Sequence, residues 1–322
     1  MTILILSALL GFGLNDLTDI VESDELQSAV TVYEAFDQAG REITETEEYY
    51  IGRAVAANIL ASSSPMMNWN GVTYVNMVGA VIAGFSPRPS TYGGWHFMIL
   101  DDMNINALSC PGGIVLLNRG LCDLAGNEDE LAAIIAHEAA HIVLRHGIQS
   151  VEKAKLARAW TTLGHEGAQH LGSDEIQELS DNYSDVVNDI TMNLVTRGYS
   201  RDSEQQADSL AVHILAQAGY DPMALAVILD RMNALTERSG PGFWQTHPDP
   251  GQRARWVREE IAASGLASPD PSAIAARADR FQNLYTESTP PAAESAGENH
   301  NTENRRSNTS SGASRGSAGG RI

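Results

Sequence analysis

Apolar residues recur at every third or fourth position through two long stretches of this sequence. Residues 22–63 show this spacing behind acidic first turns, in ESDELQSAVTVYEAF and ETEEYYIGRAVAANIL. The same spacing returns at Asn127 and continues to about Tyr285. Three- and four-residue spacing places apolar side chains on one face of a helix, so both stretches are predicted to be helical.

The stretch between them has a different pattern. Within residues 68–118, short runs of β-branched and aromatic residues alternate with glycine and proline, in NGVTYVNMVGAVI, GWHFMILDD and NINALSCPGGIVLLN. Such runs are typical of strands joined by turns. The sequence therefore predicts an α+β fold that is mostly helical, with a small β-sheet beside the helical body.

The two ends of the chain differ from the part between them. An apolar run from Ile3 to Leu14 is shorter than the roughly 20 residues of a spanning helix. It resembles the apolar part of an export signal, although no Lys or Arg precedes it, and a buried first helix or strand is the alternative. The other end is rich in Ser, Gly, Asn and Pro, which predicts disorder. We expect an N-terminal segment (1–21), a folded domain (22–285) and a low-complexity tail (286–322).

Composition and charge exclude several classes of partner and of metal site. The chain has 322 residues, 43% of them hydrophobic, a formal net charge of −20 and a pI near 4.7. A protein this acidic lacks the positive charge that binding to nucleic acid or to anionic lipid requires. The longest internal apolar stretch, 75–85, is too short for a stable membrane span. Cys110 and Cys122 are the only cysteines, so a four-cysteine zinc site cannot form, and whether the two pair stays open.

The segment AAIIAHEAAHIVLRHG, residues 132–147, holds two histidines spaced by four. In a helix, His137 and His141 point within roughly 40° of each other and can reach one metal ion. Glu138 is turned by about 100°, beside the metal, where its carboxylate can take a proton from a bound water. The alternative is a helix with two inert buried histidines. Burying three polar groups unpaired costs free energy that a metal would remove, which favours a metal site.

The ends of this helix and the other histidines have simpler interpretations. Asn127 and Glu130 predict an N-terminal cap, and Gly147 is expected to end the helix, with Arg145 and His146 as cations at its carbonyl end. The remaining histidines are interpreted as non-ligands. In GHEGAQH, His165 and His170 lie five residues apart and cannot share a metal from one helical face. His96 is expected in a strand, and His213 is expected on a core helix.

A catalytic zinc ion needs a third protein ligand besides water. The stretch RDSEQQADSLAVHILAQAGYDP, residues 201–222, places Glu204 and Asp208 on one helical face, with the small Ala207 between them. An exposed acidic first turn is the alternative, but the helix continues with apolar residues in core spacing. We expect Glu204 to bind the metal and Asp208 to accept the outer ring N–H of a ligand histidine.

Together, HEAAH, SEQQAD and QTHPDP resemble the HtpX/BepA-type zinc metallopeptidases, relatives of the CAAX prenyl proteases and of Oma-type peptidases. The similarity covers roughly Glu42 to Arg258. It implies a gluzincin-like domain with one Zn²⁺ per chain, held by His137, His141 and Glu204, and Glu138 as catalytic base. It also implies a soluble BepA-like enzyme, although BepA-like proteins continue into helical repeats where this chain has its low-complexity tail.

The resemblance implies an endopeptidase for extended or misfolded polypeptides in cell-envelope quality control, located in the bacterial periplasm or envelope. His247 could donate to the oxyanion as a catalytic residue, or bind the zinc and hold the enzyme latent. One alternative is a latent protease that acts mainly as a chaperone or assembly factor. Another is a metal-dependent enzyme that acts on a non-peptide amide. The natural substrate and the oligomeric state stay open.

The substrate is expected to pair with an exposed strand edge within residues 104–118. A site of this kind reads the main chain and favours unfolded polypeptides. The simpler interpretation of its proline and glycines is a hairpin turn, and both can hold together. The candidate substrate-binding residues are Asn106, Pro111, Gly112, Gly113 and Arg253.

Overall fold

The computed structural model describes residues 42–67, 70–151, 184–236 and 246–286. The N-terminal segment (1–21), the GHEGAQH stretch with His165 and His170, and the low-complexity tail from 287 onward lie outside the described residues. The three-part division of the chain therefore stays a prediction.

Helices make up most of the described chain, with one three-stranded sheet. This confirms the predicted α+β class. No described helix has the length and apolar character that a bilayer crossing requires. The elements are α4 (Glu45–Leu60), α5 (Asn70–Gly84), β1 (His96–Leu100), β2 (Ala107–Cys110), β3 (Ile114–Asn118), α6 (Arg119–Leu124), α7 (Glu128–Val143), α8 (His146–Gln149), the π-helical turn η2 (Asn193–Arg197), α11 (Arg201–Gln217), α12 (Met223–Thr236), α14 (Pro250–Ser264), α15 (Pro271–Phe281) and the π-helical turn η3 (Gln282–Thr286).

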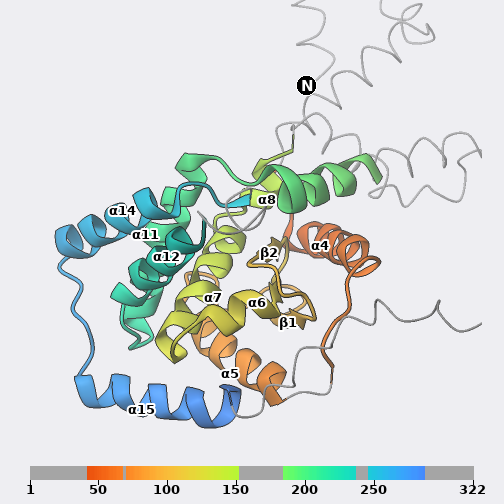
Figure 1. The fold of residues 1–322 in the computed structure, drawn as a ribbon. Helices are drawn as coiled ribbons and strands as arrows, with labels where there is room; N and C mark the ends of the chain where they lie inside the picture. The colour runs from red at the N-terminus through yellow and green to blue at the C-terminus, as the bar shows by residue number, and fades with distance from the viewer. Residues whose placement is uncertain (1–41, 68–69, 152–183, 237–245, 287–322) are drawn as a thin grey trace, which may run out of the picture. The chain divides into compact units, whose positions relative to one another are not determined.

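Helix α7 runs through the middle of the domain (Figure 1), with α11, α12 and α14 on one side and the sheet and α4 on the other. Every residue of α7 from Glu128 to Ile142 is buried. A helix enclosed on all sides must be apolar around its whole circumference or have its polar groups paired. The polar residues of α7 are therefore the informative ones.

The sheet has the order β1-β3-β2, with β1 parallel and β2 antiparallel to β3. Both of its faces are covered. Val115 and Leu117 of β3 join the larger core with α5 and α7, and Leu116 between them joins a smaller core with α4. Alternate residues of a strand face opposite sides. Burial on both sides explains why β3 reads as a continuous apolar run.

Helix α5 corrects the strand prediction for NGVTYVNMVGAVI. Residues Asn70–Gly84 form a helix whose buried positions include Val75, Val78 and Ile82, at three- and four-residue spacing. At Gly79, a side chain would come within 2.4 Å of the phenylalanine ring in β1, so glycine allows this helix to pack on the sheet. Tertiary packing has overridden the strand preference of the β-branched residues.

The C-terminal end of α7 also differs from expectation. The helix ends at Val143, not near Gly147, because Arg145 adopts a left-handed conformation with φ of 58°. Arg145 pairs with the buried carboxylate of Glu48 at 3.2 Å. The chain then turns into α8, and His146 lies buried with 3% exposure. The prediction of His146 as a cation at a helix end is therefore wrong.

A cap and several ion pairs stabilise the N-terminal end of α7. The Asn127 side chain accepts a hydrogen bond from the backbone of Glu130, which confirms the predicted cap. Arg280 and Arg277 of α15 donate paired hydrogen bonds to the buried carboxylates of Glu128 and Asp129. Burial opposes ionisation of Glu128, but bonds from Arg280 and two tyrosines prevail and hold its pKa below its ordinary value. Ion pairs thus anchor α7 to α15.

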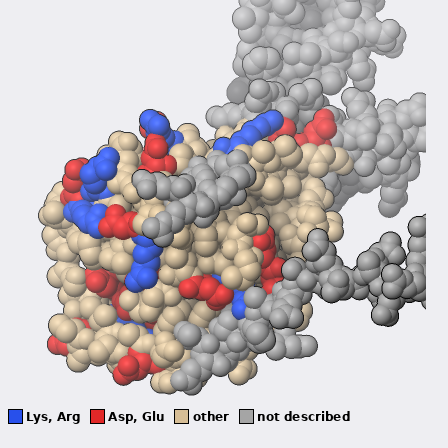
Figure 2. All heavy atoms as spheres, viewed as in Figure 1, with Lys and Arg blue, Asp and Glu red and all other residues tan. Residues whose placement is uncertain are grey.

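Figure 2 shows one face of the domain with its charged side chains. On the part of this face that belongs to described residues, Lys and Arg are interspersed with Asp and Glu and form no large basic patch.

Candidate functional site

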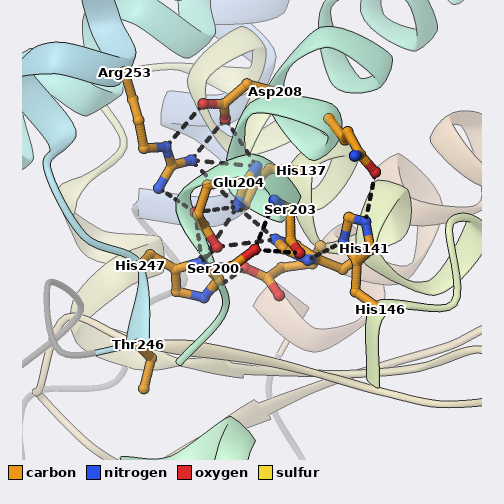
Figure 3. Close-up of polar contacts among 12 residues, drawn as sticks. His137, His141, His146, Ser200, Ser203, Glu204, Asp208, Thr246, His247 and Arg253 are labelled. Carbon is orange, nitrogen blue, oxygen red and sulfur yellow. Dashed lines mark hydrogen bonds and ion pairs between the residues drawn. The ribbon is translucent and has the colours of Figure 1, made fainter. Parts of the chain in front are cut away.

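Three separate parts of the chain bring together four side chains of the types that bind metals in proteins. His137 and His141 come from α7, Glu204 from α11, and His247 from the turn before α14 (Figure 3). All four are buried, and their nearest donor atoms lie within 4.8 Å of one another. Ala207 of α11 is fully buried, and its small side chain lets α11 approach α7. Within the described residues, no other group of three such side chains converges.

The distances between the donor atoms fit one metal ion. His141 Nε2 lies 3.1 Å from His137 Nε2 and 3.4 Å from Glu204 Oε1. His247 Nδ1 lies 3.3 Å from His137 Nε2 and 3.0 Å from Glu204 Oε1. A tetrahedral zinc ion with ordinary bond lengths separates its ligand atoms by about 3.3 Å. The donor set and its spacing are those of a divalent metal site.

The outer nitrogen of His137 is held by a carboxylate. Its Nδ1 lies 3.0 Å from Asp208 Oδ1, which leaves Nε2 facing the other donors. Asp208 thus lies where the sequence analysis expected it, against the outer nitrogen of a candidate ligand. Burial and Arg253 oppose protonation of His137, but hydrogen bonds to Asp208 and Glu204 prevail and raise its pKa to about 9. A metal ion must therefore compete with a proton for this imidazole.

Arg253 occupies the interior of the site. It is 1% exposed, and its guanidinium lies 2.6 Å from both Asp208 Oδ1 and Glu204 Oε2. Burial opposes ionisation of both carboxyls, but this cation holds the pKa of each below its ordinary value. The expectation that Arg253 faces the substrate does not match this placement. Two buried carboxylates require a cation nearby, and that requirement was the signal for its position.

Two further residues surround His141. Its Nδ1 lies 2.9 Å from Nδ1 of His146, whose Nε2 lies 3.3 Å from Gln206 Oε1. The ring of Tyr199 stacks on His141, with centroids 4.1 Å apart and planes 14° apart. Burial lowers the pKa of both His141 and His146. Sequence reasoning missed these contacts, because they depend on the break in the helix at Arg145.

Within the described part of the chain, Glu138 is the polar residue of α7 whose side chain has no hydrogen-bond partner. Both of its carboxylate oxygens are buried and, among the described residues, accept no hydrogen bond. Nε2 of His247 lies 3.7 Å from Oε1, beyond hydrogen-bond distance. Leaving a carboxylate buried without a hydrogen bond is costly. Its position beside the four donors is that of a group that accepts a proton from a molecule bound there, so the residues present fit a catalytic metal.

The predicted substrate edge is covered in this structure. Strand β2 lies at the edge of the sheet, but all four of its residues are buried, and η2 contacts it. Thr246 donates a hydrogen bond to the Asn106 side chain, and its carbonyl accepts from the backbone of Tyr199. Gly198, with φ of 73°, allows this approach, since a side chain there would lie 2.3 Å from the Thr246 carbonyl. The expectation of an exposed edge is therefore corrected.

The residues after β2 form a hairpin turn. Gly112 and Gly113 have φ of 78° and 109° and connect β2 to β3, and the Gly112 N–H donates to the Glu48 carboxylate. Gly112 and Pro111 lie against α4, where a side chain at Gly112 would lie 2.7 Å from the backbone of Tyr49, whereas Gly113 lies against Thr91 and Gly94. The conformation of this segment is therefore the hairpin turn that the sequence analysis gave as its simpler interpretation.

The remaining candidates are accounted for. Cys110 and Cys122 are buried free thiols and do not pair, and burial raises the pKa of both. His96 begins β1, which confirms its expected place in a strand. His213 of α11 pairs with Glu260 at 3.2 Å, away from the four donors.

Comparisons with known proteins agree with this geometry. The sequence profile of peptidase family M48 matches residues 72–261. The chain is 26% identical over 229 residues to the beta-barrel assembly-enhancing protease of Escherichia coli K12, which covers 70% of this chain and 46% of that protein. It is 32% identical over 167 residues to mitochondrial metalloendopeptidase OMA1 of Schizosaccharomyces pombe, covering 51% and 46%. It is 24% identical over 163 residues to metalloprotease LoiP of Escherichia coli, covering 51% and 61%. The chain spans about half the length of the curated relatives it matches.

Proposed function

The chain belongs to peptidase family M48 and is a metalloprotease, and on this premise we propose that it is a zinc-dependent endopeptidase of extended or misfolded polypeptides. The observation that carries the proposal is the convergence of His137, His141 and Glu204 next to Glu138, whose carboxylate has no hydrogen-bond partner among the described residues. Histidine nitrogen and carboxylate oxygen are ligands typical of catalytic zinc.

In the proposed reaction, His137, His141 and Glu204 would hold the zinc ion, which when bound would supply Lewis acidity to the peptide carbonyl and to a water molecule. Glu138 takes a proton from the water molecule while the oxygen of that water attacks the carbonyl carbon. Glu138 then gives this proton to the amine nitrogen as the peptide C–N bond breaks. Asp208 holds the ring of His137, and Arg253 keeps the carboxylates of Asp208 and Glu204 in place.

The substrate class and location extend this proposal. We propose that an extended polypeptide pairs with the edge of β2, which requires the contacts of Thr246 and η2 with this region to open. The similarity to a beta-barrel assembly-enhancing protease supports a role in protein quality control in the bacterial cell envelope, with the periplasm as its compartment. The peptidase relatives disfavour the alternative of a non-peptide amide substrate.

Metal removal tests the proposal. We expect a chelator to abolish the digestion of denatured casein and a stoichiometric amount of Zn²⁺ to restore it, because the three proposed ligands then hold the ion again. Fragments are measured by gel and the bound metal by elemental analysis. Magnesium serves as the control ion, since it prefers oxygen ligands. Full activity in protein shown to be free of metal would mean that the proposed chemistry is wrong.

A second candidate is a latent protease with a role as chaperone or assembly factor. It is favoured by His247, whose Nδ1 lies 3.3 Å from His137 Nε2 and 3.0 Å from Glu204 Oε1. As a fourth ligand, this nitrogen would fill the position that a catalytic zinc keeps open. We propose that the described conformation is a resting state, in which Thr246 and Tyr199 hold His247 over the site.

Substitution of His247 separates its two proposed roles. If it closes the site, His247→Ala should raise the rate of casein digestion roughly tenfold, as expected for losing a contact of about 1.4 kcal/mol. If it donates to the oxyanion, the rate should fall by about 10²–10³. His213→Ala is the matched control, since this histidine lies outside the site. An unchanged rate for His247→Ala would contradict both roles.

A further inference from the structure

His141 is held from outside the candidate metal site by two more side chains in series. Its Nε2 faces the other donors, 3.1 Å from His137 Nε2 and 3.4 Å from Glu204 Oε1. Its Nδ1 is therefore the outer nitrogen, and it lies 2.9 Å from Nδ1 of His146. On the far side of that ring, His146 Nε2 lies 3.3 Å from Gln206 Oε1. The series runs from α11 through α8 to α7.

With the amide oxygen of Gln206 toward His146, as in this structure, the hydrogens in the series follow from donor and acceptor chemistry. The amide oxygen of Gln206 can only accept, so Nε2 of His146 carries a hydrogen. A neutral imidazole carries one hydrogen, which leaves Nδ1 of His146 as an acceptor. The nitrogen that faces it, Nδ1 of His141, must then be the donor. The lone pair of His141 is thus placed on Nε2, toward the other donors.

We propose that Gln206 and His146 are positioning residues that select the metal-binding tautomer of His141. The proposal rests on the metal site proposed above and adds two residues to it. The reverse arrangement shows why Gln206 matters. With a donor in place of its oxygen, His146 would donate to His141, and the Nε2 of His141 would carry a hydrogen and could not bind a metal.

Charge explains why this position holds an imidazole. His137 already uses a carboxylate, Asp208, as its outer partner, and Glu138 and Glu204 are buried close by. Arg253 pairs with Asp208 and Glu204 of this group. A further carboxylate behind His141 would add another buried negative charge, whereas a neutral imidazole accepts the same hydrogen without it.

The backbone places His146 for this role. In an uninterrupted helix, a residue five positions after His141 would point about 140° away from it. The left-handed conformation of Arg145 ends α7 early and turns α8, so that the ring of His146 meets that of His141 with centroids 4.9 Å apart. A strained non-glycine residue is expected where the surrounding contacts determine the chain path, here through the pair with Glu48.

Zinc affinity tests the proposal without reference to activity. Metal-free protein is titrated with Zn²⁺ against a chromophoric chelator. We expect His146→Leu to weaken zinc binding 10- to 100-fold, as for loss of an outer partner of a ligand histidine. We expect His146→Asn to stay within about threefold of the parent, because its amide oxygen can accept near the position of Nδ1. His213→Leu, a histidine of α11 outside the site, should match the parent.

Two variants of Gln206 keep the test valid if His146→Leu does not fold. The side chain of Gln206 lies at the surface, so its replacement should not prevent folding. Gln206→Leu should weaken zinc binding, and Gln206→Glu, which can only accept, should keep it. Parent-like affinity in both leucine variants would overturn the proposal. So would equal weakening in His146→Leu and His146→Asn together with an equal loss of thermal stability in the metal-free protein. Failure of the parent to bind zinc would instead contradict the proposed function.

Discussion

Replacing Glu138 by glutamine is expected to lower the rate of peptide hydrolysis by about 10²–10⁴, the usual contribution of a general base. Glutamine has nearly the same shape but cannot take a proton from water. Because the oxygens of Glu138 accept no hydrogen bond among the described residues, the substitution breaks no existing contact of this kind. The loss should therefore appear in kcat, with zinc content and thermal stability close to those of the parent.

The measurement is the turnover of a fluorogenic peptide or casein, together with zinc analysis of the same sample. Glu259→Gln, at an exposed position of α14, is the matched control and should keep full activity. A Glu138→Gln protein that binds zinc and cleaves at the parental rate would rule out the proposed base. If Glu138→Gln is inactive and contains no zinc, the substitution has damaged the metal site, and the loss of activity cannot be assigned to the missing base.

The second large effect concerns the buried guanidinium. Arg253→Met should lower the free energy of unfolding of the metal-free protein by roughly 3–5 kcal/mol, the cost of breaking a buried ion pair. Methionine fills part of the space but leaves Asp208 and Glu204 close together without their shared cation. Bound zinc neutralises part of that charge, so zinc should stabilise this variant more than it stabilises the parent.

Denaturant unfolding of the metal-free and zinc-loaded proteins checks this result. Arg255 is an exposed arginine of the same helix, and within the described part of the chain it donates to a backbone carbonyl of its own helix. Arg255→Met should change the stability by less than about 0.5 kcal/mol. Similar losses for the two variants would show that the Arg253 pairs contribute little. A large loss that zinc leaves unchanged would separate these pairs from the metal site.

Local helix geometry accounts for what the sequence predicted well. The spacing of His137 and His141, and of Glu204 and Asp208, specifies which side chains share a face before any tertiary contact is known. The cap at Asn127 is equally local. The convergence of the two pairs was inferred because two histidines leave a catalytic zinc ion one protein ligand short.

The remaining features depend on contacts between distant parts of the chain. Helix α5 was taken for a strand because a short apolar run fits both periods, and packing on β1 decides between them. The positions of His146 and Arg253 follow from a left-handed residue at 145 and from the meeting of α11 with α14. Burial of the β2 edge by segments near 199 and 246 could not be read from the strand itself.

The ion pairs between α15 and α7 have a consequence for the order of synthesis. Arg277 and Arg280 follow their partners Asp129 and Glu128 by 148 and 152 residues. Contacts across such separations form late in folding. While the ribosome is still adding the residues before 277, the helix that carries His137 and Glu138 lacks this anchor. Hydrolytic competence should therefore arrive only after residue 280 has been synthesised, which would spare the growing chain from its own cleavage.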